Sequence, residues 1–347
     1  MTARRSRAHT RPATMSDLAR IAGVSITTVS HVVNETRFVS DGARRRVLEA
    51  VDETGYTRNI LARSMKTATT STIGLAAPAL SKVALADLVR PIEAEARAQN
   101  LSILLTDTED DPVAELAAVE SLHARRVDGI IIAPSAPDSP AVDYLRRHGI
   151  PTVVVDRLTS GGFDQIGTEN TRSTRQLTEH LVVEGGHRRV ALVTGMPNLS
   201  TTAERRKGYR QALRESGIEV DPALIGSGYD DASTLPAILE AFLALPDPPT
   251  ALVSGNSSTT IGVMRACGAL GIRVPDDLAL VAFDDFEWAD VFHPRLTVVR
   301  QRMEEIGTRA VRLLQARIED PDGAVRTRRI PTDFVHRDSC GCATPTR

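Results

Sequence analysis

The sequence predicts a small all-α head followed by a large α/β body. Three observations predict this division. From Thr14 to Gly55 apolar residues recur at helical spacing around a glycine, whereas beyond Thr72 short apolar runs alternate with segments long enough to be helices. Residues 1–70 contain twelve Lys and Arg but six Asp and Glu, a net charge of +6, while the whole 347-residue chain carries −2. A basic head on an acidic body is typical of a chain that presents one end to a polyanion.

The head is predicted to contain three short helices. Thr14 is a suitable N-cap, and Asp17 three residues later completes a capping pattern. Gly23 can adopt the positive φ of a tight turn, Ser25 caps the second helix, and a third helix from about Asp41 to Thr54 ends at Gly55. The predicted inward-facing residues are Leu18, Ile21, Ala22, Val29, Val32, Val33, Val47, Leu48 and Val51. Two helices joined by a glycine turn, with a supporting helix, form a helix-turn-helix unit.

The second helix, within "GVSITTVSHVVN", carries small polar side chains on the face that its core does not use. In a helix-turn-helix unit the N-terminal half of this helix enters the major groove of DNA. Small hydroxyl groups allow a close approach, and their donors and acceptors suit phosphate oxygens. The alternative is the polar surface of a small helical module. The candidate DNA-contacting residues are Ser25, Ile26, Thr27, Thr28, Ser30, His31 and Asn34.

The body is predicted to contain two parallel sheets, each covered by helices on both faces. Continuous apolar runs separated by helices, such as 85–99 and 172–184, are typical of buried parallel strands. More than 250 residues of this pattern usually divide into two sheets. The candidate strands are 72–77, 101–106, 128–133, 151–156, 189–195, 250–255 and 278–285.

The stretches "TMSDLARIAGVSITTVSHVVN", "VSDGARRRVLEAVDETGYTRN" and "ARSMKTATTSTIGL" resemble the LacI/GalR family of bacterial transcriptional repressors. The resemblance extends from about Thr14 to Cys340. It implies a periplasmic-binding-protein-like body, in which two Rossmann-like lobes hold a ligand between them and the chain crosses near Gly167, Arg300 and Pro331. The expected domains are a disordered basic arm (1–13), a DNA-binding head (14–58), a hinge helix or linker (59–70), the two-lobe body (71–340; lobe 1 about 71–167 and 300–330, lobe 2 about 168–299 and 331–340) and a tail (341–347).

The resemblance also implies DNA contacts from the hinge, where a leucine of each protomer wedges into the minor groove. The matching residue here is Met65, and methionine is among the apolar side chains that part base steps. Arg58 replaces the usual proline, and His31 replaces a frequent arginine, so its contact is expected to be weaker or pH-dependent. Residues 60–70 also fit a plain linker of low helix propensity. The candidate hinge residues are Asn59, Ala62, Arg63, Met65 and Lys66.

Polar residues follow several of the predicted strands, at the edge where open parallel sheets bind ligands. Asp156, Asn256 and Asp284 each stand at the end of a predicted strand. Arg205 lies near the start of the helix that follows the predicted strand 189–195. Two carboxylates, an amide and a guanidinium suit a polyhydroxylated ligand such as a sugar. Each matches an effector-contact position of the family, although a strand-end Asp is often a helix cap and an Arg a surface ion pair.

Two further features bear on the predicted effector site. Ser257 stands where the family commonly has an aspartate, which removes one supporting carboxylate. Tyr229 and Trp288 are the candidates for stacking on a sugar, each equally suited to the surface or the core.

Catalysis is not expected. No Gly-x-Gly-x-x-Gly follows the first strand, and no Walker loop, His-Glu-x-x-His or Gly-x-Ser-x-Gly motif is present. Cys340 and Cys342 form a pair able to hold a metal, but no third and fourth ligand lie nearby in the sequence, so neither a metal nor a cofactor is expected. Three cysteines, an odd number with two of them near the C-terminal end, do not predict a structural disulfide framework.

The expected partners are double-stranded DNA with a near-palindromic operator, a small polar effector, most simply a sugar, and a second copy of the chain. No apolar run approaches the roughly 20 residues of a membrane helix, and no secretory h-region precedes the head, so a cytoplasmic protein is expected. The alternative function is a sugar-binding protein without specific DNA binding, against which the +6 head weighs. For a purely architectural DNA binder the large body would be superfluous.

Overall fold

The computed structural model describes residues 13–56, 69–78, 83–228 and 234–342, apart from the side chains of 83–86 and 287–288. The chain divides into two compact units, Met1–Thr70 and Ser71–Arg347, here called the head and the body. Within the described ranges, no helix has the length and apolar character needed to cross a membrane.

The three helices predicted for the head are confirmed. They are α1 (Met15–Ala22), α2 (Ile26–Asn34) and α3 (Asp41–Thr54). Thr14 and Asp17 form a reciprocal capping box, in which the Asp17 carboxylate accepts a 2.9 Å hydrogen bond from the Thr14 backbone N–H. Gly23 ends α1 with φ 62°, and the Ser25 hydroxyl caps α2 by accepting from the Thr28 N–H at 3.1 Å. Local sequence therefore determines both ends of the turn between α1 and α2.

The core of the head contains most of the predicted residues, together with Ala19 and Ala50. Two predictions were wrong, because the side chain of Ile21 is 39% exposed and that of Leu48 is 48% exposed. The buried stripe of α1 runs through Leu18, Ala19 and Ala22, and at about 100° per residue Ile21 lies beside it. Leu48 lies beside the stripe of α3 for the same reason.

The body contains two six-stranded sheets, which confirms the predicted α/β architecture. The first sheet has the order β11-β5-β4-β3-β1-β2, and all its pairings are parallel. Its strands are β1 (Thr72–Ala77), β2 (Ser102–Asp107), β3 (Gly129–Ile132), β4 (Thr152–Val155), β5 (Asp164–Thr168) and β11 (Thr327–Ile330).

The second sheet has the order β12-β10-β9-β8-β6-β7 and is parallel except for β12, which pairs antiparallel with β10. Its strands are β6 (Val190–Thr194), β7 (Ile225–Ser227), β8 (Ala251–Ser254), β9 (Ala279–Phe283), β10 (Thr297–Arg300) and β12 (Asp333–Val335). The seven strands predicted from apolar runs correspond to β1, β2, β3, β4, β6, β8 and β9.

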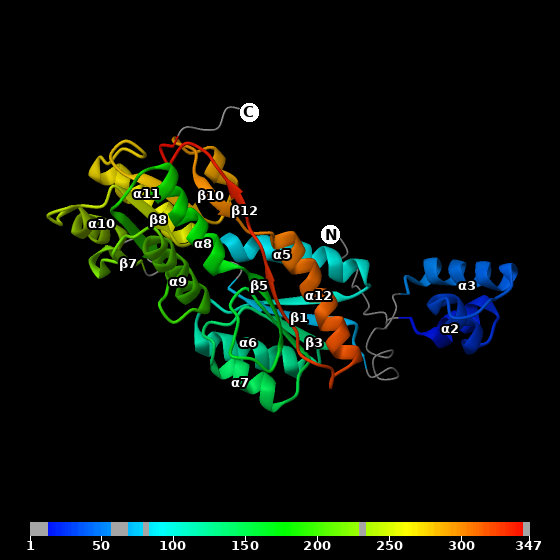
Figure 1. Ribbon diagram of the computed structural model, residues 1–347. Coiled ribbons are helices and arrows are strands. Elements are labelled where there is room, and N and C mark those ends of the chain that lie inside the picture. The colour runs from blue at the N-terminus through cyan, green and yellow to red at the C-terminus, as the bar shows by residue number, and fades with distance from the viewer. Residues whose placement is uncertain (1–12, 57–68, 79–82, 229–233, 343–347) are drawn as a thin grey trace, which may run out of the picture. The chain divides into compact units, whose positions relative to one another are not determined.

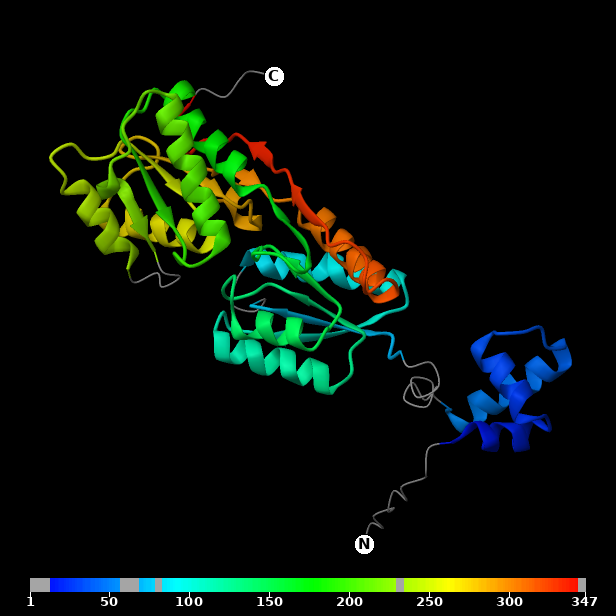
Figure 2. The same cartoon turned by 60° about the horizontal axis from the view of Figure 1, so that its bottom comes forward.

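Helices cover both faces of the first sheet, forming lobe 1 (Figure 1, Figure 2). One face packs on α5 (Val83–Ala98) and α12 (Met303–Glu319), and the other packs on α6 (Pro112–Ala124) and α7 (Pro140–Arg147). Burial on both faces explains why the sequences of β1, β3 and β4 are continuously apolar instead of alternating.

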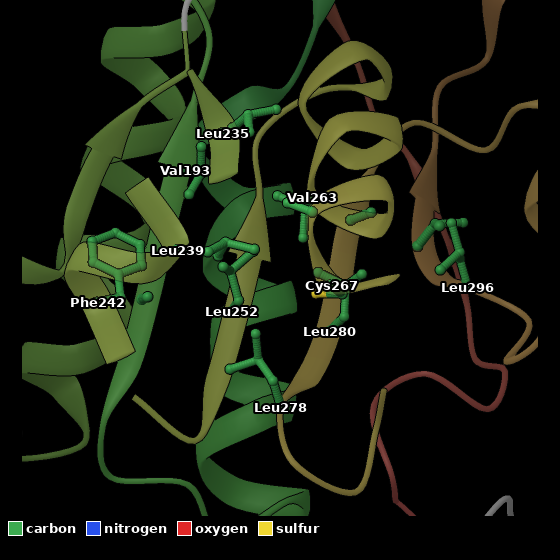
Figure 3. Packing of buried hydrophobic residues seen from close by; sticks show 14 of the residues in the cluster. Val193, Leu235, Leu239, Phe242, Leu252, Val263, Cys267, Leu278, Leu280 and Leu296 are labelled. Atoms are coloured by element: carbon green, nitrogen blue, oxygen red, sulfur yellow. The ribbon is translucent and has the colours of Figure 1, made fainter. Parts of the chain in front are cut away.

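The second sheet is covered in the same way, forming lobe 2. One face packs on α8 (Asn170–Glu179) and α9 (Ser200–Glu215), and the other on α10 (Leu235–Leu243) and α11 (Ser257–Leu270). Figure 3 shows the second of these cores, where Leu252 and Leu280 of the sheet face Leu239, Val263 and Cys267 of the helices.

The chain crosses between the lobes three times. The crossings join β5 to α8, β10 to α12 and β11 to β12, through residues 169, 301–302 and 331–332. Two crossings are hydrogen-bonded to each other, because the Thr168 hydroxyl donates to the side-chain carbonyl of Gln301. The third is tied to lobe 2 by a 2.8 Å hydrogen bond between the Thr332 and Ser173 hydroxyls.

The contact between α8 and α9 depends on Gly208. A methyl group there would overlap the carbonyl oxygen of Thr171 and lie 2.9 Å from the backbone nitrogen of Arg175. We expect Gly208→Ala to lower the free energy of unfolding by about 1–3 kcal/mol, because backbone atoms cannot give way as a flexible side chain does. The matched control is Gly268→Ala in α11, where nothing lies within 4 Å of the added carbon and a gain of up to about 1 kcal/mol is expected. Urea unfolding measures both variants, and equal effects would contradict this account of the helix contact.

Candidate functional site

The first turn of α2 is the most accessible part of the predicted DNA-contacting surface. Ser25, Ile26 and Thr27 are exposed, whereas Thr28, Ser30, His31 and Asn34 are partly buried. The Ile26 side chain is 54% exposed, although it is apolar. An apolar group between hydroxyls can contact a thymine methyl while its neighbours hydrogen-bond to base edges or phosphates.

The rest of α2 holds its polar groups in local hydrogen bonds. The Asn34 amide donates to the Ser30 carbonyl at 2.9 Å, and His31 Nδ1 lies 2.8 Å from the Thr36 hydroxyl. The imidazole of His31 therefore uses Nδ1 within the head, and Nε2 is the atom that remains for DNA.

Several predicted site residues lie outside the described residues. They are all the hinge candidates, Asn59, Ala62, Arg63, Met65 and Lys66, together with Tyr229. The Trp288 side chain is also outside the description.

In the body, the fold brings together three of the predicted effector-contacting residues. Asp156 follows β4 of lobe 1, Asp284 follows β9 of lobe 2, and Arg205 belongs to α9. Arg205 lies within electrostatic reach of both carboxylates. Arg205 and Asp284 are each only 6% exposed, so these charges are largely removed from water. We call these three residues the junction cluster.

Contacts on three sides fix the Arg205 side chain. Its Nε donates to the Asn170 side-chain oxygen at 2.9 Å, and its Nη1 donates to the Gly255 carbonyl at 2.5 Å. The guanidinium carbon lies 3.7 Å from the centroid of the Phe283 ring, a cation–π geometry. Among the described residues Nη2 has no hydrogen-bond partner, so the two N–H groups of this nitrogen are left for a ligand.

Asp284 connects the junction cluster to the crossings between the lobes. One carboxylate oxygen accepts from the Ser257 backbone N–H at 3.0 Å, and the other accepts from the Gln301 amide at 2.6 Å. Gln301 in turn accepts from Thr168, so one side chain links a ligand-contacting candidate to two crossings.

Asp156 and Asp284 both have a left-handed backbone, with φ 59° and 85°. Each backbone N–H donates at 3.0 Å to a neighbouring strand, to the carbonyls of Ile166 and Val299 respectively. For residues other than glycine such conformations cost about 1–3 kcal/mol and occur where the surrounding structure imposes them, often at functional sites.

Asn256, which the sequence analysis gave as an effector contact, acts as a helix cap. Its side-chain oxygen accepts from the Thr259 N–H at 2.8 Å and caps α11. Ser257 holds Asp284 through its backbone N–H, an interaction that does not depend on the side chain at this position. The replacement of aspartate by Ser257 therefore leaves this contact intact.

Lobe 1 contributes a buried ion pair that the sequence did not predict. Arg157 makes a bidentate contact with the Asp110 carboxylate, and its Nη2 lies 3.0 Å from Oδ2. Burial raises the pKa of Asp156, while the guanidinium groups of Arg157 and Arg205 oppose this shift. The negative charge of Asp156 therefore destabilises the folded body when no ligand donates hydrogen bonds to the carboxylate.

A cavity of about 730 Å³ adjoins the junction cluster. Ser257 and Asp284 line it, but Asp156, Arg205 and Asn256 do not. Much of its lining consists of charged side chains that pair with each other, such as Arg302 with Asp333 and Arg309 with Glu305. The cavity therefore lies beside the cluster, toward α12.

Sequence reasoning missed Asn170, Gln301 and Phe283 as residues that position the cluster. Asn170 directly follows one crossing and Gln301 belongs to another, so the predicted crossings near Gly167 and Arg300 were the available signal. Phe283 precedes Asp284 in β9, where an apolar strand residue carries no sign of a special role.

Comparison with known proteins identifies both units. Residues 14–59 match the model for bacterial regulatory proteins of the lacI family, and residues 178–340 match a periplasmic binding protein-like domain. The chain is 32% identical to the HTH-type transcriptional repressor PurR of Vibrio atlanticus, covering 94% of this chain and 98% of the relative. It is also 32% identical to the ribose operon repressor of Escherichia coli K12, covering 89% and 94%.

A solved structure gives the same result for the fold. The lac repressor dimer bound to operator and the anti-inducer ONPF has a TM-score of 0.84 and 27% identity, covering 95% of this chain and 99% of that one. The relatives are transcriptional repressors and not enzymes, in agreement with the absence of catalytic motifs.

The burial of Asp156 generates a prediction about stability. Because its pKa is raised in the folded body, its contribution to stability is greatest below the ordinary Asp value near 4 and is lost as the pH rises through the shifted pKa. Asp156→Asn should therefore raise the melting temperature at pH 7, with a gain that shrinks toward pH 4. The control is Asp285→Asn, which breaks a bidentate pair with Arg337 and should lower it. Melting curves from pH 4 to 8 test this, and a lower melting temperature for Asp156→Asn at pH 7 would show that its charge stabilises the unliganded body.

Proposed function

The chain belongs to the LacI family of bacterial regulatory proteins, and we propose that it represses transcription under the control of a small polar effector. The observation that carries the proposal is the junction cluster, in which two carboxylates and a guanidinium come from both lobes of the body. The head of the same chain exposes the first turn of α2, the candidate recognition helix. The head supplies operator binding and the body supplies control.

DNA binding is assigned to the head. The exposed Ser25, Ile26 and Thr27 would meet base edges in the major groove, and the other candidates of α2 would meet phosphates. A lac repressor dimer bound to operator has the same fold. We therefore propose a homodimer on a near-palindromic operator, with Met65 of each hinge in the minor groove and Asn59, Ala62, Arg63 and Lys66 beside it.

The effector is proposed to be a sugar that bridges the lobes. Carboxylates accept pairs of hydrogen bonds from neighbouring hydroxyls, and Arg205 Nη2 can donate to a ring or hydroxyl oxygen. Ribose is the first compound to test, because a ribose operon repressor is among the relatives. Asp156, Arg205 and Asp284 are the proposed direct contacts, with Tyr229 as a stacking residue and Asn256 contributing only its amide nitrogen.

Effector binding would act through the angle between the lobes. A ligand that contacts Asp156 of lobe 1 and Asp284 of lobe 2 favours one relative arrangement, and the three crossings transmit it. In this proposal the hinge, residues 59–70, folds or melts in response and so changes operator affinity. Because we propose that the protein binds an operator, we also propose that it is located in the cytoplasm.

The role of α2 can be tested on the DNA upstream of the protein's own gene. Thr27→Ala should weaken specific binding about 5–100-fold, because a lost base contact costs about 1–3 kcal/mol. Asp52→Ala, an exposed change in α3, should leave binding within about threefold. Fluorescence anisotropy with competitor DNA measures both.

Equal affinities of Thr27→Ala and the unaltered protein for the DNA would contradict the assignment of the first turn of α2 to the DNA interface. Sequence-blind binding by the unaltered protein, at several salt concentrations and with ribose, glucose or adenine present, would favour the alternative of a sugar-binding protein without an operator.

A further inference from the structure

Three side chains of types that bind metals lie close together in lobe 2, where the chain after β12 meets the end of α8. A ring nitrogen of His180 and the sulfurs of Cys340 and Cys342 all lie within 4.8 Å of one another. His180 begins η1 (His180–Glu184), a π-helical turn that continues α8, and the cysteines belong to the segment drawn red after β12 (Figure 1). Residues far apart in the sequence therefore supply three ligand atoms in one place.

His180 has an unused ligand atom. Its Nε2 is buried and has no hydrogen-bond partner in the part of the chain that the structure describes. The ring is held by Phe334 and His336, whose centroids lie 5.0 and 4.9 Å away. A buried polar atom without a partner calls for an explanation, and a role as a metal ligand is one of the recognised explanations. The π-helical turn at the same residue is a further feature that is frequent at functional sites.

The sulfurs have a suitable environment. Cys340 is buried, and its sulfur lies 3.1 Å from His336 Nε2, while Cys342 is partly buried. Thiolate sulfur and imidazole nitrogen are the ligands of structural zinc sites. Two thiolates neutralise a divalent cation, so an occupied site adds no net charge to this partly buried region.

We infer that His180, Cys340 and Cys342 bind a zinc ion. His336, whose Nε2 lies 3.1 Å from the Cys340 sulfur but outside this group of three, would supply the fourth ligand by moving toward the ion. Zinc-to-ligand bonds of about 2.1–2.3 Å place ligand atoms about 3.4–3.8 Å apart, so the three atoms would draw together by about 1 Å. Each cysteine loses its thiol proton to solvent as its sulfur bonds to the metal.

The zinc ion would fasten the C-terminal segment to lobe 2. Two residues between His336 and Cys340 contact lobe 2. The Ser339 hydroxyl donates to the Leu280 carbonyl at 2.6 Å, and Arg337 makes a bidentate pair with Asp285. Asp285 adjoins Asp284 of the junction cluster. The ion would therefore hold in place the segment that supports the end of β9. It would stabilise the folded body more strongly as the free zinc concentration rises above the dissociation constant.

Cobalt substitution tests the site directly. Full-length protein, reduced and stripped of metal, is titrated with Co²⁺ while its absorption spectrum is recorded. We expect one equivalent per chain to produce tetrahedral ligand-field bands and a thiolate-to-cobalt charge-transfer band, and Zn²⁺ to abolish both. Zn²⁺ should also raise the melting temperature by several degrees.

Matched variants assign the ligands. Cys342→Ser should roughly halve the charge-transfer absorption per bound cobalt, whereas His180→Gln should weaken binding at least tenfold while preserving the two-sulfur absorption. Cys267→Ala is the control, because this cysteine is packed between α11 and the second sheet (Figure 3). Circular dichroism establishes that each variant is folded. The absence of cobalt bands in the unaltered protein would overturn the inference, and so would bands that are lost in Cys267→Ala but undiminished in Cys342→Ser.

Discussion

The body depends on one electrostatic constraint, which is the burial of charge where its two lobes meet. Asp156 comes from lobe 1, Arg205 and Asp284 from lobe 2, and each is placed by a different strand or helix. Removing charged groups from water is costly unless each gains hydrogen-bonding or ionic partners. Here the protein supplies only some of these partners. Arg205 is held at Nε and Nη1 but not at Nη2 among the described residues, and the two carboxylates sit on left-handed backbone. In the proposed function, a ligand with several hydroxyl groups completes these interactions and thereby favours one arrangement of the lobes.

The same groups explain how ligand binding can reach beyond the cluster. Asp284 accepts from Gln301, and Gln301 accepts from Thr168, so a change at the carboxylate acts on two of the three chain crossings. The third crossing leads into β12 and then to Arg337, which holds Asp285. All three crossings are short, so a small rotation between lobes must be absorbed by few backbone angles. This geometry suits a two-state change of lobe angle better than a gradual deformation.

Sequence patterns predicted the elements that are defined locally. Capping residues located the helices of the head, and continuous apolar runs located seven strands. The strands β5, β7, β10, β11 and β12 were missed because none of them contains an apolar run longer than two residues. The site shows the same limit. Strand-end Asp156 and Asp284 could be identified, but Gln301 and the proximity of His180 to Cys340 follow from long-range packing that no local pattern encodes.

The most direct test of the account is the change in operator affinity caused by an effector, measured in two variants of α9. Arg205→Lys removes the guanidinium fork of the junction cluster, whereas Arg214→Lys makes the same change at an exposed position of the same helix. With the first sugar found to shift operator binding, ribose being tried first, the account predicts at least a tenfold shift in the unaltered protein and in Arg214→Lys but little or none in Arg205→Lys. All three should bind the operator equally well without the sugar. An undiminished shift in Arg205→Lys would contradict the assignment of the junction cluster as the site that controls DNA binding.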